Sequence, residues 1–207
     1  MPDYNLSRAV EVPMTRARYV GGIALLLLVM LIWIKSRVER YRHIQHVTQV
    51  VGSLNGAVGA DGPSDGVSFN IVGLSPLVTD QTLTELSPSM GHCDIREIGL
   101  GGTPVSDVAL QAVIRYCHSS LRQLELSGTK ITGDTIESLT ECPNLESVSL
   151  SVDALSEPAI QAIRQMPKLQ KVLLFNAAPS DVRVEKLKNV RPDLDVSVYS
   201  RSHFLAR

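Results

Sequence analysis

Apolar residues recur in two alternating patterns along the second half of the chain. The stretch LRQLELSGTKITGDTIESLTECPNL, residues 121–145, first places leucines at steps of three and two, and then places Ile136, Leu139 and Cys142 at steps of three. The first pattern is typical of a strand with one buried face, and the second is typical of a helix. Each such stretch therefore predicts one strand followed by one helix.

The same pattern returns at a regular interval of about 25 residues, a period typical of repeat architectures. Six sets of apolar residues keep their register: Ile95, Leu121, Leu145, Leu169 and Leu194; Ile98, Leu124, Val148 and Val172; Leu100, Leu126, Leu150 and Leu174; Val78, Val105, Ile131 and Leu155; Leu83, Leu110, Ile136 and Ile160; Leu86, Val113, Leu139, Ile163 and Leu187. One unit cannot bury both its strand and its helix residues alone, so we expect the units to stack around a shared core.

Written as LxxLxLxxTxIxDxxLxxLxxCPNL, this unit resembles the leucine-rich repeat of the cysteine-type, ribonuclease-inhibitor-like variety. The resemblance covers residues 67–199, with departures at Gly73, in a strand leucine position, and at Pro179, in a loop isoleucine position. The layout also resembles small bacterial membrane-anchored leucine-rich-repeat proteins of the planctomycete type. This resemblance implies an α/β fold, a short solenoid with parallel strands on its concave face and helices on its convex face.

A charge-free run, YVGGIALLLLVMLIWI, extends from Tyr19 to Ile34 between basic flanks. As a helix it would span about 24 Å at about 1.5 Å per residue, and flanking Arg and Lys side chains can extend to reach the full bilayer core. A buried soluble helix would show a polar face, and a cleaved signal peptide would be followed by small residues. The run predicts an uncleaved, single-pass transmembrane helix, and the nearly balanced basic flanks leave its orientation open.

Between this run and the repeats, residues 36–54 continue with helical periodicity. Their apolar stripe contains Val38, Tyr41, Ile44, Val47, Val50 and Val51. The Gly-, Asp- and Pro-rich residues 55–66 predict a turn or loop, and VSFNIVGL predicts a strand after it. The expected organisation is an N-terminal flank (1–18), a transmembrane helix (19–35), a capping helix and loop (36–66), the repeat domain (67–199) and a C-terminal tail (200–207).

Residues between the strand leucines of such a solenoid point outward in rows. The rows contain Glu97, Gln123, Ser147 and Lys171; Gly99, Glu125, Ser149 and Leu173; Gly101, Ser127, Ser151 and Phe175. Leu173 and Phe175 are the apolar exceptions, and they are either a contact for a partner or a surface that the tail covers with Phe204 and Leu205. The candidate protein-binding residues are Glu97, Gln123, Glu125, Lys171, Leu173 and Phe175.

Other candidate chemistry has simpler interpretations. The motifs HC at 92–93 and CH at 117–118 lack the C-x-x-C pairing of zinc sites, and we interpret Cys93, Cys117 and Cys142 as buried core thiols. His43 and His46, without a third ligand nearby in the sequence, are interpreted as interfacial or solvated. The motif GLGGTP at 99–104 lacks the G-K-[ST] of a phosphate loop. Carboxylates that recur at expected helix starts indicate caps or dipole partners: Asp80, Asp107 and Asp134.

Composition narrows the functional classes. The 207 residues carry a formal net charge of −1, which gives no electrostatic reason to expect nucleic acid. No G-x-S-x-G or H-E-x-x-H motif is present. The sequence therefore predicts a single-pass membrane protein that binds another protein, with no catalysis, cofactor, metal or small-molecule substrate. The alternative is a structural or assembly subunit of a membrane protein complex.

Overall fold

The computed structural model describes residues 14–61, 68–72 and 78–200, and it describes the side chains of 25–59 and 78–200. The chain forms two compact units, residues 1–41 and residues 42–207. The first unit contains most of one long helix. The second contains a sheet with its helices.

Helix α1 runs from Met14 to Ser53 without a break, 40 residues in all. It joins the predicted apolar helix to the predicted helix over 36–54, because no Gly or Pro lies between them to end it. Residues 19–24 of the predicted transmembrane segment have side chains outside the described part of the chain. From Leu25 to Ile34 the side chains are exposed, and the Arg37 guanidinium lies 4.9 Å from the centre of the Trp33 ring.

Among the helices that the structure describes, none combines the length and the apolar character needed to cross a bilayer.

The last turns of α1, in the second unit, contribute to the core. Val47 and Val51 are buried, and Ile44 and Val50 pack against the same core. The predicted apolar stripe is therefore confirmed from Ile44 onward. Val38 and Tyr41, at the start of this stripe and in the first unit, are helical but exposed.

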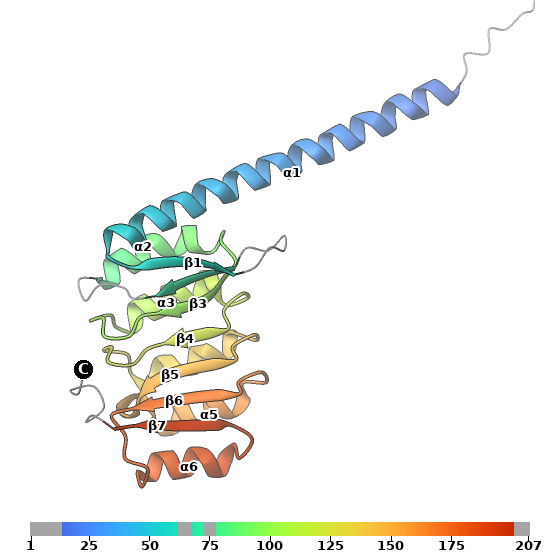
Figure 1. Cartoon of the computed structure of the whole chain (residues 1–207). Helices are drawn as coiled ribbons and strands as arrows, with labels where there is room; N and C mark the ends of the chain where they lie inside the picture. Colours follow the sequence, from blue (N-terminus) through green and yellow to red (C-terminus); the bar gives the residue numbers. More distant parts are fainter. Residues whose placement is uncertain (1–13, 62–67, 73–77, 201–207) are drawn as a thin grey trace, which may run out of the picture. The chain divides into compact units, whose positions relative to one another are not determined.

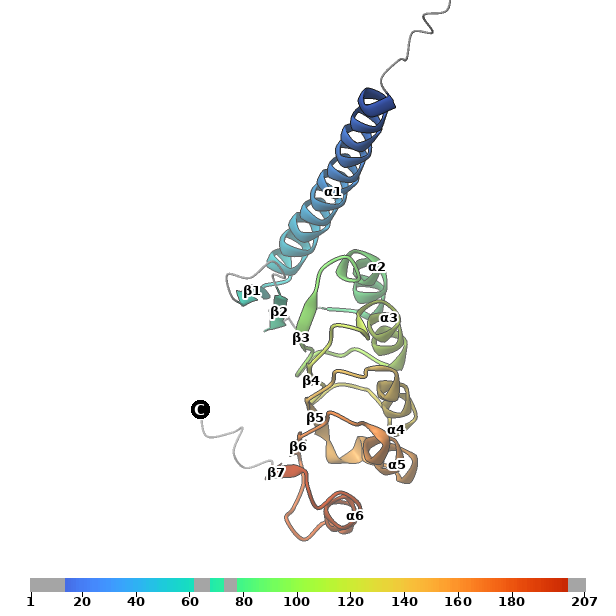
Figure 2. The same ribbon diagram turned by 90° about the vertical axis from the view of Figure 1, so that its right-hand side faces the viewer.

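Within the described residues, the sheet contains seven strands in sequence order, and helices alternate with them (Figure 1). The strands are β1 (Ala57–Asp61), β2 (Ser68–Val72), β3 (Ile95–Gly99), β4 (Gln123–Glu125), β5 (Ser147–Ser151), β6 (Lys171–Phe175) and β7 (Asp195–Tyr199). The helices after α1 are α2 (Asp80–Met90), α3 (Asp107–Cys117), α4 (Gly133–Ile136), α5 (Glu157–Gln165) and α6 (Val182–Val190), with 3-10 helices η1 (Glu137–Glu141) and η2 (Val152–Ala154). Strands β2 to β7 are parallel, and α2 to α6 lie on one side of the sheet (Figure 2). The predicted α/β alternation is confirmed.

One prediction about the start of the sheet is wrong. Residues 57–61, predicted as loop, form β1 and pair antiparallel with β2, from Ala57 opposite Val72 to Asp61 opposite Ser68. The sequence AVGAD has a weak intrinsic preference for strand, so the pairing comes from the free edge of β2. The expected strand over 67–72 is confirmed as β2.

The six predicted apolar sets form the core. Every member is buried. Backbone pairing follows the predicted register, since Ile98 lies opposite Leu124, Leu124 opposite Val148, and Val148 opposite Val172. Leu150 pairs with Leu174, and the Leu126 amide donates to the Ser149 carbonyl at 2.8 Å. The shared core lies between the sheet and its helices.

At the C-terminal end, Arg191 links the end of α6 to the end of α5. Its guanidinium donates to the carbonyls of Ile163, Met166 and Leu169 at 3.0–3.2 Å and forms an ion pair with Asp193 at 2.8 Å. These carbonyls belong to the last turn of α5 and to the residues after it, where the helix supplies no backbone N–H donors. The Arg191 side chain is only 14% exposed.

We expect Arg191→Met to lower the free energy of unfolding by about 2–3 kcal/mol, because it leaves buried carbonyls without a charged donor. Urea unfolding of the full chain measures the change. Arg164→Met, at an exposed position on α5, is the matched control and should change the free energy by less than about 0.5 kcal/mol. Equal stabilities of the two variants would contradict this role of Arg191.

Candidate functional site

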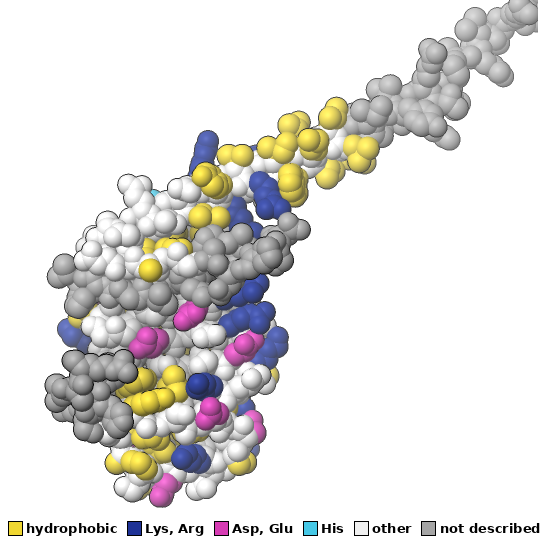
Figure 3. Space-filling model, in the orientation of Figure 1, with side chains coloured by type: hydrophobic (Ala, Val, Ile, Leu, Met, Phe, Trp, Pro, Cys, Tyr) yellow, Lys and Arg dark blue, Asp and Glu magenta, His cyan; other side chains and the backbone are white. Residues whose placement is uncertain are grey.

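The outward side of strands β3 to β6, here called the sheet face, brings all six predicted residues together. Its rows follow the backbone register: Glu97, Gln123, Ser147 and Lys171; Glu125, Ser149 and Leu173; Ser151 and Phe175. All six line one open hollow of about 600 Å³, together with residues that include Glu146 and Gln170. Figure 3 shows an apolar patch on this face, with acidic and basic side chains around it.

Glu125 is an acidic residue of the sheet face whose side chain has a defined position. Its Oε1 accepts a hydrogen bond from the Ser127 hydroxyl at 2.7 Å. The carboxylate lies over Gly101 on the neighbouring segment, where a Cβ would overlap its oxygens. Glu97 lies on the adjacent strand, and neither carboxylate forms an ion pair with Lys or Arg among the residues that the structure describes. A positioned carboxylate therefore faces solvent beside a second one.

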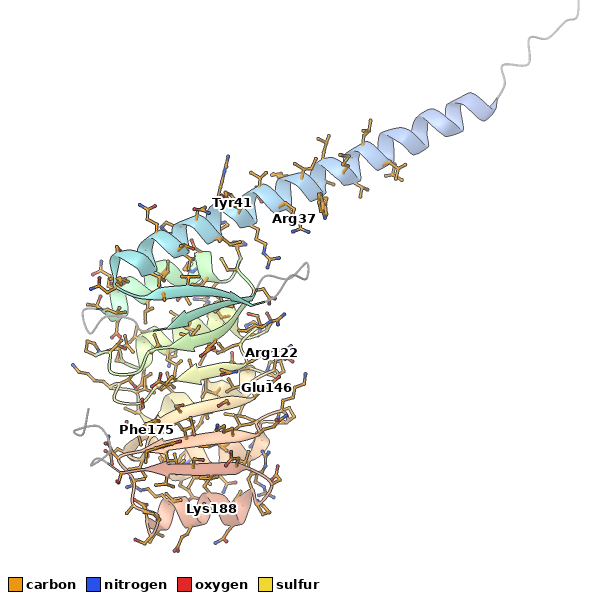
Figure 4. The ribbon with its side chains drawn as sticks, viewed as in Figure 1. Arg37, Tyr41, Arg122, Glu146, Phe175 and Lys188 are labelled. Carbon is orange, nitrogen blue, oxygen red and sulfur yellow. The ribbon has the colours of Figure 1, made fainter. Side chains whose placement is uncertain are left out.

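An ion pair borders the face. Arg122 Nη1 lies 2.8 Å from Glu146 Oε1, and this pair links the residues that directly precede β4 and β5 (Figure 4). The two side chains are 46% and 37% exposed, so the pair adds little stability but does neutralise the Glu146 carboxylate. Among the described carboxylates that line this hollow, Glu97 and Glu125 are thus the two without an ion pair.

Leu173 and Phe175 form the apolar part, and both are half-buried. The Phe175 ring stacks on Tyr199 of β7, with centroids 5.0 Å apart and planes 15° apart. Sequence reasoning did not identify Tyr199, although it lies 24 residues after Phe175 in the sequence and is paired with it in register. The predicted cover by Phe204 and Leu205 lies outside the described residues.

The three cysteines are buried thiols, as predicted. Burial raises the pKa of Cys117 to about 12, with further contributions from Cys93 and Cys142, and burial chiefly raises the pKa of Cys142 to about 12. Thiols with such pKa values stay protonated at neutral pH and are poor metal ligands. Within the described residues, no group of His, Cys, Asp and Glu has a geometry suited to a metal ion.

Two of the histidines are more constrained than predicted. The His43 ring stacks on His92 with centroids 4.2 Å apart, and its Nδ1 lies 3.4 Å from the Ser89 hydroxyl. His46 Nδ1 lies 3.2 Å from the same hydroxyl. These contacts join the end of α1 to the end of α2, so His43 is interfacial, which is one of the two interpretations that the sequence allowed.

The recurring aspartates are structural. Asp80 and Asp107 begin α2 and α3, where the helix dipole favours a carboxylate, as predicted. Each also accepts two hydrogen bonds from the residue that caps the next helix, Ser106 at 2.7 and 2.5 Å and Thr132 at 2.9 and 2.8 Å. Burial raises the pKa of Asp107, but hydrogen bonds from Thr135 and Thr132 outweigh it and hold this pKa below its usual value.

This arrangement predicts an acid-sensitive contribution to stability. The folded-state pKa of Asp107 is lowered, so its ionised carboxylate contributes about 1 kcal/mol to the free energy of unfolding. This contribution is present above pH about 4 and is lost as pH falls through the folded-state pKa. We expect the difference in unfolding free energy between wild type and Asp107→Asn to shrink between pH 6 and pH 2. Asp134→Asn, at the corresponding position of the next unit, controls for loss of a first-turn carboxylate. A pH-independent difference would contradict the prediction.

Comparison with known protein families and with curated proteins finds no match to this chain. The functional conclusion therefore depends on the sheet face and on α1.

Proposed function

We propose that the protein is a membrane-anchored, non-catalytic leucine-rich-repeat protein that binds another protein through the sheet face. One observation carries this proposal: six residues chosen from repeat spacing line a single hollow on the side of the sheet that the helices leave uncovered. In a short leucine-rich-repeat solenoid this side is the concave face.

Several local features support the repeat interpretation. Backbone with positive φ recurs two residues after the last strand leucine of three units, at Gly102 (73°), Gly128 (69°) and Asn176 (59°). Gly and Asn are the residues that adopt this conformation most readily. Thr103 and Thr129, at the next position, each donate their hydroxyl to the carbonyl three residues earlier, at 2.6 and 2.7 Å. The same turn chemistry thus returns with the same period.

The exposed apolar surface of α1 supports the membrane anchor. The side chains from Leu25 to Ile34 are 38–70% exposed on all sides of the helix. A soluble helix buries its apolar residues along one face, whereas lipid accommodates an apolar surface all around. Lys35 follows this surface directly, with Arg37 and Arg40 behind it, as expected at a membrane boundary.

A protein is the partner class that best fits the sheet face. Small-molecule sites enclose about 70–90% of the ligand surface, but this hollow is open along the strands. The face combines aromatic and aliphatic side chains with an acidic part and small polar residues between them. Protein interfaces use the same combination of an apolar anchor and a polar surround.

The test is cross-linking of the full chain in its native membrane, followed by identification of the partner. The variant Gln123→Ala/Glu125→Ala/Lys171→Ala/Phe175→Ala should reduce recovery about tenfold or more, because it removes the anchors of the face. A matched control carries four alanines at exposed helix positions: Gln111, Arg115, Arg164 and Gln165. Unchanged recovery with the first variant, at unchanged thermal stability, would show that the sheet face is not the binding surface.

The alternative, a structural subunit of a membrane complex, draws support from the same apolar surface of α1, which could pack against other helices. Exchanging residues 19–34 for an unrelated apolar sequence separates the two. Retained partner recovery supports an anchor that only tethers the protein. Loss of recovery, with membrane association intact, supports the structural role.

A further inference from the structure

We propose that the partner presents a Lys or Arg side chain to Glu125 and an apolar side chain to Leu173, two strands away on the same surface. This inference rests on the proposed function and adds the chemistry of the bound segment.

The Glu125 carboxylate has a fixed position before any partner binds. The Ser127 hydroxyl holds one oxygen, and the missing side chain of Gly101 provides the space that the carboxylate occupies. A surface glutamate normally loses side-chain entropy when it pairs, which makes most surface ion pairs weak. Here the fold has already restricted this side chain, so pairing with a partner's cation costs less.

A second carboxylate strengthens the preference for a cation. Glu97 pairs in register with Gln123, two residues before Glu125, so the two glutamates are diagonal neighbours on adjacent strands. Strand geometry places their backbones about 8 Å apart. Two like charges at this separation repel each other, and a cation between them relieves the repulsion. The same pair of charges disfavours an acidic partner residue at this end.

The register sets the distance to the apolar end. Glu125 lies opposite Ser149, and Ser149 lies opposite Leu173, so Glu125 and Leu173 are two strands apart in one row. With about 4.8 Å between strands, the separation is about 10 Å. Ser149 between them is small and buried, which leaves the surface open for a crossing segment. An extended segment with three residues per turn spans about 9.3 Å between residues i and i+3.

Lys171 gives the bound segment a direction. It lies on β6 two residues before Leu173, on the same side of the strand, and it is exposed. Lys171 lies opposite the exposed Asp195 of β7, so the two opposite charges offset each other and this end offers a cation no net attraction. The cation therefore belongs over β3 and β4, and the apolar residue over β6.

A phage-displayed library of random twelve-residue peptides, selected on the full chain in lipid nanodiscs, tests the inference. We expect enriched peptides to carry Lys or Arg at a constant spacing from Leu, Met or Phe. Synthetic copies should bind Glu125→Gln about three- to tenfold more weakly than wild type. Glu141→Gln, which removes an exposed carboxylate on the helix side, is the matched control and should leave affinity unchanged.

Gly101→Ala separates the position of the carboxylate from its charge. The positive φ at this turn belongs to Gly102, so alanine fits the backbone of Gly101, but its Cβ must displace the Glu125 carboxylate. We expect weaker peptide binding in Gly101→Ala at unchanged net charge and nearly unchanged stability.

The remaining outcomes distinguish the two proposals. Enriched peptides that lack a cation, or that bind Glu125→Gln as tightly as wild type, overturn this inference. If such peptides still bind Leu173→Ala more weakly, the proposed function stands. Peptides that bind wild type, Glu125→Gln and Leu173→Ala equally, or a selection without enrichment, overturn both.

Discussion

Leu124→Ala should lower the free energy of unfolding by about 2–5 kcal/mol, a large fraction of the total of about 5–15 kcal/mol for a protein of this kind. Leu124 is 2% exposed and lies in the centre of β4, with Ile98 and Val148 as its register neighbours. β4 has three residues, and Leu124 is the one of them whose side chain is buried in the core. Denaturant unfolding followed by circular dichroism measures the loss.

The matched control is Gln123→Ala, the preceding residue on the opposite side of the same strand. Its side chain is exposed, and we expect a change within about 0.5 kcal/mol. If both variants melt like wild type, Leu124 does not belong to a shared core and the repeat alignment is wrong.

Leu27→Arg/Leu31→Arg should release the protein from membranes. The two residues lie one turn apart on α1, and both are exposed. Each arginine at the centre of a bilayer costs about 2.5–3.5 kcal/mol, so together they cost about 5–7 kcal/mol of insertion free energy. Leu27→Phe/Leu31→Phe keeps the surface apolar and should remain bound.

Trp33 provides the measurement, because it is the single tryptophan of the chain. In vesicles that contain brominated lipids, its fluorescence should be quenched in wild type and in the phenylalanine variant, but not in the arginine variant. Unquenched wild-type fluorescence, or equal quenching in all three proteins, would contradict the membrane anchor.

Much of the fold could be predicted because its apolar pattern is both local and periodic. The step of two at Leu124 and Leu126 identifies a strand with one buried face, and the return of the pattern one repeat later at Val148 and Leu150 fixes which strands are neighbours. The outward residues followed from the same alternation. For this reason the rows of the sheet face match the backbone register.

Other features depend on contacts that spacing does not encode. β1 forms because β2 offers an edge, although AVGAD alone favours a loop. The unit around Ile136 and Leu139 forms the short helix α4 followed by the 3-10 helix η1, although its apolar spacing is like that of the units that form longer α-helices. The hydrogen bonds from Ser106 to Asp80 join residues 26 positions apart, so only the stacked structure reveals them.

The candidate site, too, could be predicted only in part from the sequence. The rows could be predicted, but the position of the Glu125 carboxylate over Gly101 depends on side-chain packing between two strands. Tyr199 was missed because the sequence reading ended its outward rows one strand too early, although the same period leads from Phe175 to it.

A photo-cross-linking amino acid placed at Gln123 in one variant and at Gln111 in another tests the binding surface most directly. Gln123 lies on the sheet face and Gln111 is exposed on α3, on the helix side. In native membranes, irradiation should attach the partner to the first variant and leave the second free of adducts. Adducts from Gln111 with none from Gln123 would contradict binding through the sheet face.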